Sequence, residues 1–194
     1  MLNNVPHLWV FAGPNGAGKS TLVAKYLRQR LPIVNPDVIA VGLGGGGPNT
    51  SAAIEAGKIA IRQRAALLEA GESFAIETTL SGKSEIRLLH DAGLAGYKVN
   101  LVYVGVKSAQ VSERRVAHRV ARGEHFVPNE DIVRRYPRSM ENLSVAMRLA
   151  DRTWIVDNTG RPFQLLMIRE HGATKIVARM LPQWVLTAVP EELR

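Results

Sequence analysis

Residues 13–20 read GPNGAGKS and carry the densest chemical signal in the sequence. They fit the pattern G-x-x-x-x-G-K-[ST], with the apolar run 7–12 before them and a helical pattern after them. Glycines let the backbone wrap around a phosphate chain and point N–H groups at it, and a following helix N-terminus attracts the same charge. The predicted phosphate-binding loop consists of Gly13, Pro14, Asn15, Gly16, Ala17, Gly18, Lys19, Ser20 and Thr21.

Two side chains of this loop are suited to phosphate and metal chemistry. In such a loop the lysine reaches the β- and γ-phosphates of a nucleoside triphosphate, and the hydroxyl after it ligates Mg²⁺. We therefore predict ATP and Mg²⁺ as cofactors, with Lys19 as a catalytic residue and Ser20 as a metal ligand.

A carboxylate follows the short apolar pair Ile33-Val34 in the sequence VNPD (34–37). A carboxylate near a phosphate can accept a hydrogen bond from an acceptor hydroxyl and take its proton late in the transfer. Asp37 is thus the predicted catalytic base. The alternative is that Asp37 is the N-cap of a short helix, a position where Asp is favoured.

A second carboxylate, Glu77, follows the apolar residues Phe74–Ile76, and Thr78 comes next. We predict that Glu77 and Thr78 contact the substrate. Glu77 could orient the acceptor or hold a Mg²⁺-bound water, and a solvated strand end is the remaining alternative. Asp157 closes another apolar run; it could cap the following turn through its own side chain or contact a nucleotide base.

Arginines concentrate between Arg114 and Arg138, and three of them recur at helical spacing: Arg115, Arg119 and Arg122. Guanidinium groups suit phosphate oxygens, although an ordinary exposed helix face is the alternative for any single one.

We predict a closing lid over residues 108–140, hinged at Gly123. Within it Arg119 and Arg122 are the predicted catalytic residues. His125 could contact a phosphate, and a structural hydrogen bond is the alternative for it. Arg134 and Arg135 are predicted to bind substrate.

Strands alternate with helices along the chain. The predicted strands are 7–12, 33–34, 74–76, 97–106 and 153–156, with a closing hairpin of 163–169 and 175–180. The predicted helices are 19–31, 51–70, 83–92, 108–122 and 129–149, and 41–50 is a predicted loop. This alternation predicts an α/β fold: a P-loop kinase-like three-layer sandwich with a mostly parallel central sheet, a helical lid and a C-terminal β-hairpin. We expect one domain spanning 1–194. Because ligands bind beyond the carboxyl ends of parallel strands, Gly13, Asp37 and Glu77 should converge.

The composition excludes several classes of protein and site. The 194 residues contain no cysteine, which excludes disulfides and thiolate metal sites. No signal-peptide pattern and no run of about 18 apolar residues occurs, so we expect a cytoplasmic protein without membrane contact. The formal net charge of +8 suits a phosphate-handling lid at least as well as a nucleic-acid surface. The three tryptophans, Trp9, Trp154 and Trp184, are expected in strands or the core.

The ordered set of GPNGAGKST, VNPD (34–37), IETTLSG (76–82) and RVAHRVARGEHFVP (115–128) resembles the zeta toxin family of P-loop kinases. The resemblance extends from the first strand to about Asn158. It implies ATP-dependent phosphorylation of a hydroxyl, with UDP-N-acetylglucosamine as the acceptor of the best-known members, and an antitoxin protein as partner. It also implies Lys19 and Ser20 as the phosphate and Mg²⁺ pair, Asp37 as the base, Glu77 as a substrate-positioning acid and Arg119 as a lid arginine.

Three functions are compatible with these residues. The first is a kinase acting on a small molecule such as a nucleotide-sugar, which the acid after the second strand and the arginine-rich lid favour. The second is a nucleic-acid-directed kinase or ATPase, for which the sequence contains no RNA-recognition motif. The third is a nucleotide-binding toxin–antitoxin component whose essential property is protein binding, and it is compatible with the first.

Overall fold

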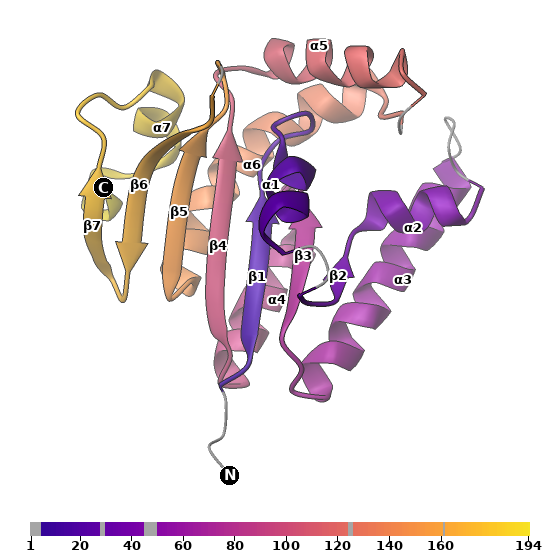
Figure 1. Ribbon diagram of the computed structural model, residues 1–194, viewed down its shortest axis with the longest axis horizontal. Helices are drawn as coiled ribbons and strands as arrows, with labels where there is room; N and C mark the ends of the chain where they lie inside the picture. The colour runs from indigo at the N-terminus through magenta and orange to yellow at the C-terminus, as the bar shows by residue number, and fades with distance from the viewer. Residues whose placement is uncertain (1–4, 28–29, 45–49, 124–125, 161) are drawn as a thin grey trace.

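The computed structural model describes residues 5–27, 30–44, 50–123, 126–160 and 162–194. Seven strands form one sheet in the order β2-β3-β1-β4-β5-β6-β7 (Figure 1). The parallel strands are β1 (His7–Ala12), β2 (Ile33–Val34), β3 (Phe74–Thr78), β4 (Lys98–Gly105) and β5 (Arg152–Asp157). Strands β6 (Gln164–Glu170) and β7 (Ala173–Val177) add an antiparallel hairpin. This confirms the predicted α/β class with a mostly parallel, P-loop kinase-like sheet and a C-terminal hairpin.

Helices pack on both faces of this sheet. They are α1 (Lys19–Tyr26), α2 (Pro36–Gly42), α3 (Thr50–Glu69), α4 (Lys83–Leu94), α5 (Ala109–Val120), α6 (Asn129–Leu149) and α7 (Gln183–Ala188), with a 3₁₀ turn at Glu191–Leu193. Helix α1 covers the face that carries Phe11 and Val104. Helices α3, α4, α6 and α7 bury the opposite face, around Leu8, Phe74 and Leu101 (Figure 1). The three-layer arrangement therefore follows from apolar strands that are buried on both faces.

Strand β1 lies between β3 and β4, and its register with both is parallel. Phe11 pairs with Glu77 on one side and with Val102 on the other. Parallel strands all end at the same edge of a sheet, so the segments that follow β1, β2 and β3 must meet there.

Several boundaries differ from the sequence-based expectation. Helix α1 ends at Tyr26 rather than near residue 31, and β7 occupies 173–177 rather than 175–180. Helix α2 extends into the segment predicted as a loop, because Asn35 caps it and Pro36 fixes its first turn. Helix α7 was not predicted, since its six residues are too few to show a clear helical period.

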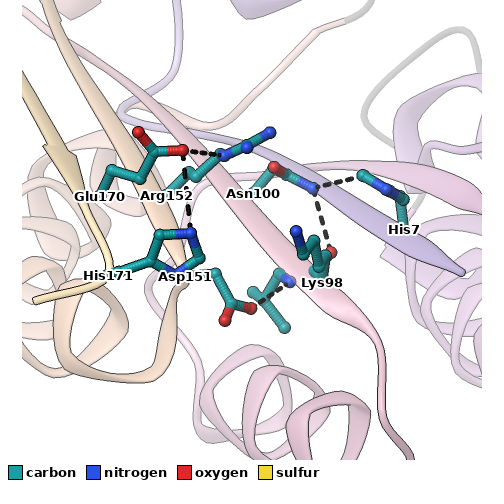
Figure 2. Close-up of polar contacts among 8 residues, drawn as sticks. His7, Lys98, Asn100, Asp151, Arg152, Glu170 and His171 are labelled. Atoms are coloured by element: carbon teal, nitrogen blue, oxygen red, sulfur yellow. Dashed lines mark hydrogen bonds and ion pairs between the residues drawn. The ribbon is translucent and has the colours of Figure 1, made fainter. Parts of the chain in front are cut away.

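The amino-terminal edge of the sheet is held by polar contacts that Figure 2 shows. Asp151 accepts a hydrogen bond from the backbone N–H of Val99 at 2.8 Å, and Arg152 donates to Glu170 at 2.6 Å. The amide of Asn100 donates to the carbonyl of Lys98 at 3.0 Å. The first two contacts join β4 to β5 and β5 to β6 at the end of the strands away from the phosphate-binding loop.

The tryptophans are strand or core residues, as predicted. Trp9 and Trp154 stack on each other across β4, with ring centroids 5.7 Å apart. Trp184 is buried and donates from its indole N–H to Asp157 at 2.7 Å. It packs directly against Gly105, so α7 braces the carboxyl ends of β4 and β5.

In the part of the chain that the structure describes, no helix is both long enough and apolar enough to cross a lipid bilayer.

Replacing Gly105 with Ala should destabilise the protein by about 1–3 kcal/mol, because the new methyl group would lie 2.3 Å from the Trp184 ring. The matched control is Gly57→Ala in α3, where nothing lies within 4 Å of the added carbon. There alanine should raise stability by about 0.5–1 kcal/mol, because it favours the helix. Urea denaturation of the three proteins measures both effects, and equal midpoints for Gly105→Ala and wild type would contradict the packing described.

Candidate active site

The loop between β1 and α1 approaches its neighbours too closely to carry side chains at two of its glycines. Gly13 has φ +136°, and a Cβ there would lie 2.1 Å from the carbonyl oxygen of Val104. Gly18 has φ +98°, and a Cβ there would lie 2.6 Å from the amide nitrogen of Asn158. Only glycine fits these positions without displacing backbone or a packed side chain.

The side chain of Lys19 folds back over this loop. Its ammonium group donates hydrogen bonds to the carbonyls of Gly13 and Pro14, at 2.8 and 2.9 Å. The pKa of Lys19 is lowered to about 8, chiefly by burial; Asp37 and Glu77 oppose this shift, and Arg119 contributes to it. The lysine is therefore a half-buried cation whose loss of water outweighs the attraction of the nearby acids, which is a site ready to accept an anion.

Ser20, at the start of α1, donates a hydrogen bond from its hydroxyl to Glu77 at 2.6 Å. Glu77 is buried at the end of β3. A hydroxyl and a carboxylate in contact supply oxygen ligands of the kind that Mg²⁺ prefers. Among the described residues no group of three or more acids or histidines could hold a metal ion. A Mg²⁺ ion at this pair would take its remaining ligands from phosphate and water.

Asp37 lies in the first turn of α2. Asn35 is the N-cap of that helix, because its side chain accepts a hydrogen bond from the backbone N–H of Asp37 at 2.9 Å. The alternative prediction that Asp37 is itself the cap is therefore wrong.

One cavity of about 1150 Å³ joins these groups. The predicted residues that line it are Asn15, Gly16, Gly18, Lys19, Ser20, Thr21, Asp37, Glu77, Thr78, Arg119, Arg122 and Arg135. Four predicted residues do not line it: Gly13, Pro14 and Ala17, which lie in the loop backbone, and Arg134.

The arginines enter the cavity from α5 and α6. Arg115 and Arg119 line it from α5, and Arg122 lines it from the turn that follows this helix, so the three arginines share one side of the cavity as predicted. The Nε of Arg119 is buried without a hydrogen-bond partner among the described residues. Arg135 lines the cavity from α6 and donates to Asp131 at 2.7 Å.

Arg134 bonds the same aspartate but is 55% exposed and lies outside the cavity. The arginines of α5 are thus better placed to meet a phosphate than those of α6. His125 and residues 45–49 of the predicted loop lie outside the described residues.

Part of the predicted lid is fixed to the sheet. Tyr103 and Ser139 share a buried hydrogen bond of 2.9 Å, and Tyr136 donates to the carbonyl of Val106 at 2.8 Å. Leu143, at the far end of α6, is fully buried. The first half of α5 is anchored as well, because Arg115 donates to the carbonyls of Gly16 and Thr159 at 3.4 and 3.2 Å. Closure over the cavity would therefore have to come from the end of α5 and the turn at Gly123 rather than from all of 108–140.

Several residues that line the cavity were not predicted as site residues: Asn35, Glu85, His118, Asn158, Pro162 and Phe163. Asn158 donates from its amide to the carbonyl of Ala17 at 2.7 Å, which joins the turn after β5 to the phosphate-binding loop. Asp157 caps that turn by accepting from both the hydroxyl and the N–H of Thr159. These bonds confirm the prediction that Asp157 caps the turn. Asn158 could have been predicted as a site residue, because its turn follows the carboxyl end of a parallel strand.

A protein-family model described as an AAA domain matches residues 8–143, which include the loop, both acids and the arginines of α5. The chain belongs to this AAA domain family. An uncharacterized protein of Haemophilus influenzae is 34% identical to this chain over 134 residues. The match covers 66% of this chain and 94% of that protein.

Solved structures show the same fold at low sequence identity. The AvrRxo1-ORF1:-ORF2 complex superposes with a TM-score of 0.74 at 16% identity, and the match covers 96% of this chain and 65% of that one. The same complex with ATP superposes with a TM-score of 0.64 at 17% identity, and the match covers 90% of this chain and 61% of that one. This chain therefore spans less than two thirds of that protein. The PezAT toxin–antitoxin system of Streptococcus pneumoniae superposes with a TM-score of 0.58 at 18% identity, and the match covers 80% of this chain and 70% of that one.

Replacing Lys19 with Met should remove a pH dependence of stability. The pKa of Lys19 falls from 10.5 to about 8 in the folded protein. Between these values the unfolded chain binds more protons, so the free energy of unfolding rises with pH. Urea unfolding of nucleotide-free wild type and Lys19→Met at pH values from about 7 to about 9.5 tests this.

Across this range the free energy of unfolding of the wild type should rise relative to that of Lys19→Met. Lys25→Met, at an exposed position of α1, is the control and should keep the wild-type dependence. The same dependence in all three proteins would place the ammonium group of Lys19 in solvent.

Proposed function

We propose that the protein is an ATP- and Mg²⁺-dependent phosphotransferase that acts on a hydroxyl of a small molecule. The observation that carries this proposal is the single cavity in which Lys19, Ser20 and Arg119 face Asp37. A half-buried ammonium group and a guanidinium suit the terminal phosphate, and a carboxylate across the same cavity suits the acceptor hydroxyl.

The triphosphate would bind along residues 13–20. The backbone N–H groups of this loop and the N-terminus of α1 point positive charge at its phosphates. Lys19 would exchange the carbonyls of Gly13 and Pro14 for phosphate oxygens, which relieves its incomplete pairing. Ser20 and Glu77 would hold Mg²⁺, which neutralises phosphate charge when bound.

Transfer needs an acceptor oxygen in line with the bond that breaks. The acceptor oxygen forms a bond to the γ-phosphorus, the bond from that phosphorus to the β–γ bridging oxygen breaks, and ADP leaves. Asp37 takes the proton of the acceptor hydroxyl and then releases it to solvent. Arg119 and Arg122 offset the negative charge that spreads over the transferred group.

For the acceptor we propose UDP-N-acetylglucosamine as the leading candidate, supported by the resemblance of four ordered motifs to the zeta toxin family. An antitoxin protein is the proposed partner. It is supported by the fold shared with the AvrRxo1-ORF1:-ORF2 complex and with PezAT, which is a toxin–antitoxin system. We propose one catalytic domain over 1–194, with the end of α5 and the turn at Gly123 as its moving lid.

Incubation with ATP, Mg²⁺ and single acceptors, read by mass spectrometry for a phosphate adduct, tests the proposal. The acceptors are UDP-N-acetylglucosamine, nucleosides and NAD. One of them should gain a phosphate in step with ADP release. Hydrolysis of ATP at the same rate with and without every acceptor would contradict a phosphotransferase.

Asp37→Asn should lower kcat by about 10²-fold or more and leave ATP affinity unchanged, because the amide cannot take the proton. The matched control is Asp91→Asn on α4, whose carboxylate pairs with Arg87 outside the cavity. It should retain the wild-type rate. Full transfer by Asp37→Asn would remove Asp37 from the chemistry.

Arg119→Met should lower kcat by about 10²-fold or more, because the guanidinium meets charge that develops during transfer. Arg114→Met replaces an arginine of the same helix that does not line the cavity, and it should change kcat by less than about threefold. Equal losses in the two variants would indicate a general effect of the charge of α5.

A further inference from the structure

A buried ion pair stands at the end of the cavity nearest β2 and β3. Arg64 of α3 faces Glu85 of α4, with Nη1 and Oε1 3.6 Å apart. Their side chains are only 6% and 15% exposed, and Glu85 lines the cavity together with Asp37 and Thr79. Because β2 and β3 lie on one side of β1 and β5 lies on the other, this end lies opposite the Asn158 turn.

The hydrogen bonds of this pair are incomplete. Nε of Arg64 and Oε2 of Glu85 are buried and have no partner within the described residues. Burial lowers the pKa of Arg64, and it outweighs the opposing effect of Glu85. A buried pair that served stability alone should be fully hydrogen-bonded, since unpaired buried polar atoms are costly. The pair is therefore kept at a cost in stability, at a place where Glu85 lines the cavity.

The same helix contains a contrasting pair. Arg62 donates to Glu55 at 3.0 Å, with both side chains largely exposed at 71% and 46%. That contact is an ordinary surface ion pair, worth little to stability. It serves as an internal control for the buried pair two residues further along α3.

The chemistry of the surrounding wall sets what can bind beside Glu85. Carboxylates of Asp37, Glu77 and Glu85 line this side of the cavity, whereas the arginines line it from α5 and α6. The hydroxyl of Thr78 is already engaged by the N–H of Leu80. A ligand group on this side meets hydrogen-bond acceptors that carry negative charge, so it must offer donors and no negative charge of its own.

We propose that Glu85, held in place by Arg64, determines which acceptor the cavity binds. It accepts a hydrogen bond from an uncharged hydroxyl or amide group of the acceptor and excludes acceptors that carry a carboxylate or phosphate at that position. The proposal rests on the proposed function and adds a specificity-determining residue to it.

Gly82 provides an independent way to move this carboxylate. A Cβ at Gly82 would lie 2.7 Å from Oε2 of Glu85. The φ of Gly82 is −110°, which any residue adopts. Alanine at this position therefore keeps the backbone of the α4 cap and displaces the carboxylate, while the charge on Glu85 is retained.

The experiment compares two ligands that differ by one charge. Calorimetry measures binding of UDP-glucose and of UDP-glucuronic acid, in which a carboxylate replaces a hydroxymethyl group. A non-hydrolysable ATP analogue and Mg²⁺ are present throughout. The proteins are wild type, Glu85→Gln, Gly82→Ala and the surface control Glu55→Gln. Melting temperatures establish that each variant is folded.

Wild type and Glu55→Gln should bind UDP-glucose at least about tenfold more tightly than UDP-glucuronic acid. In Glu85→Gln the preference should fall below about threefold, because the amide no longer repels the carboxylate. Gly82→Ala should weaken binding of UDP-glucose by about tenfold. Affinity for the ATP analogue should not change in any variant.

Three results would overturn the assignment: wild type binds the two ligands equally, wild type binds neither, or Glu85→Gln keeps the full preference. Its failure is distinguishable from failure of the proposed function, because binding is measured without transfer. If the protein discriminates between the two ligands through Glu85 but transfers no phosphate, the role of Glu85 is supported and the kinase function is contradicted. If it transfers phosphate but its ligand preference does not depend on Glu85, the kinase function is supported and the role of Glu85 is contradicted.

Discussion

The parallel pairing of β1 with β3 and β4 is the constraint on which the site depends. Parallel strands end at one edge of a sheet, and the register of β1 with β3 places Phe11 opposite Glu77. The phosphate-binding loop and the Glu77 carboxylate are therefore brought together by backbone hydrogen bonds, before any side chain makes a contact. The 2.6 Å bond between Ser20 and Glu77 is a consequence of that pairing.

Positive and negative side chains line opposite sides of the cavity, and this separation of charge indicates which ligands each side can bind. Arginines of α5 and the Lys19 ammonium supply positive charge, while Asp37, Glu77 and Glu85 supply negative charge on the side of β2 and β3. Lys19 stands between them, held by backbone carbonyls and incompletely neutralised. Such an arrangement favours a polyanion on one side and an uncharged, hydrogen-bonding molecule on the other.

The sequence predicted the fold class and the centre of the site because both depend on local patterns. Glycine spacing with flanking apolar runs located the loop, and acids after apolar runs located Asp37 and Glu77. Helical spacing placed Arg115, Arg119 and Arg122 on one face. These signals need only a few neighbouring residues to be interpreted.

The residues that escaped prediction act through long-range packing. Glu85 was not predicted because its importance comes from Arg64, a residue of another helix. Phe163 and Asn158 reach the loop from the segment that follows β5, about 140 residues along the chain, and Trp184 of α7 packs against Gly105. The failure of α6 to be a free lid follows from Tyr103 and Ser139, which are distant in sequence. Contacts of this kind leave no periodic trace in a single sequence.

The most direct test of the account is a crystal structure of the protein with Mg²⁺ and a non-hydrolysable ATP analogue. The account predicts that the Lys19 ammonium leaves the carbonyls of Gly13 and Pro14 for the β- and γ-phosphates, and that the γ-phosphate lies in the cavity facing Asp37. Lys19 remaining on those carbonyls, with the triphosphate bound elsewhere or its γ-phosphate turned away from Asp37, would contradict it.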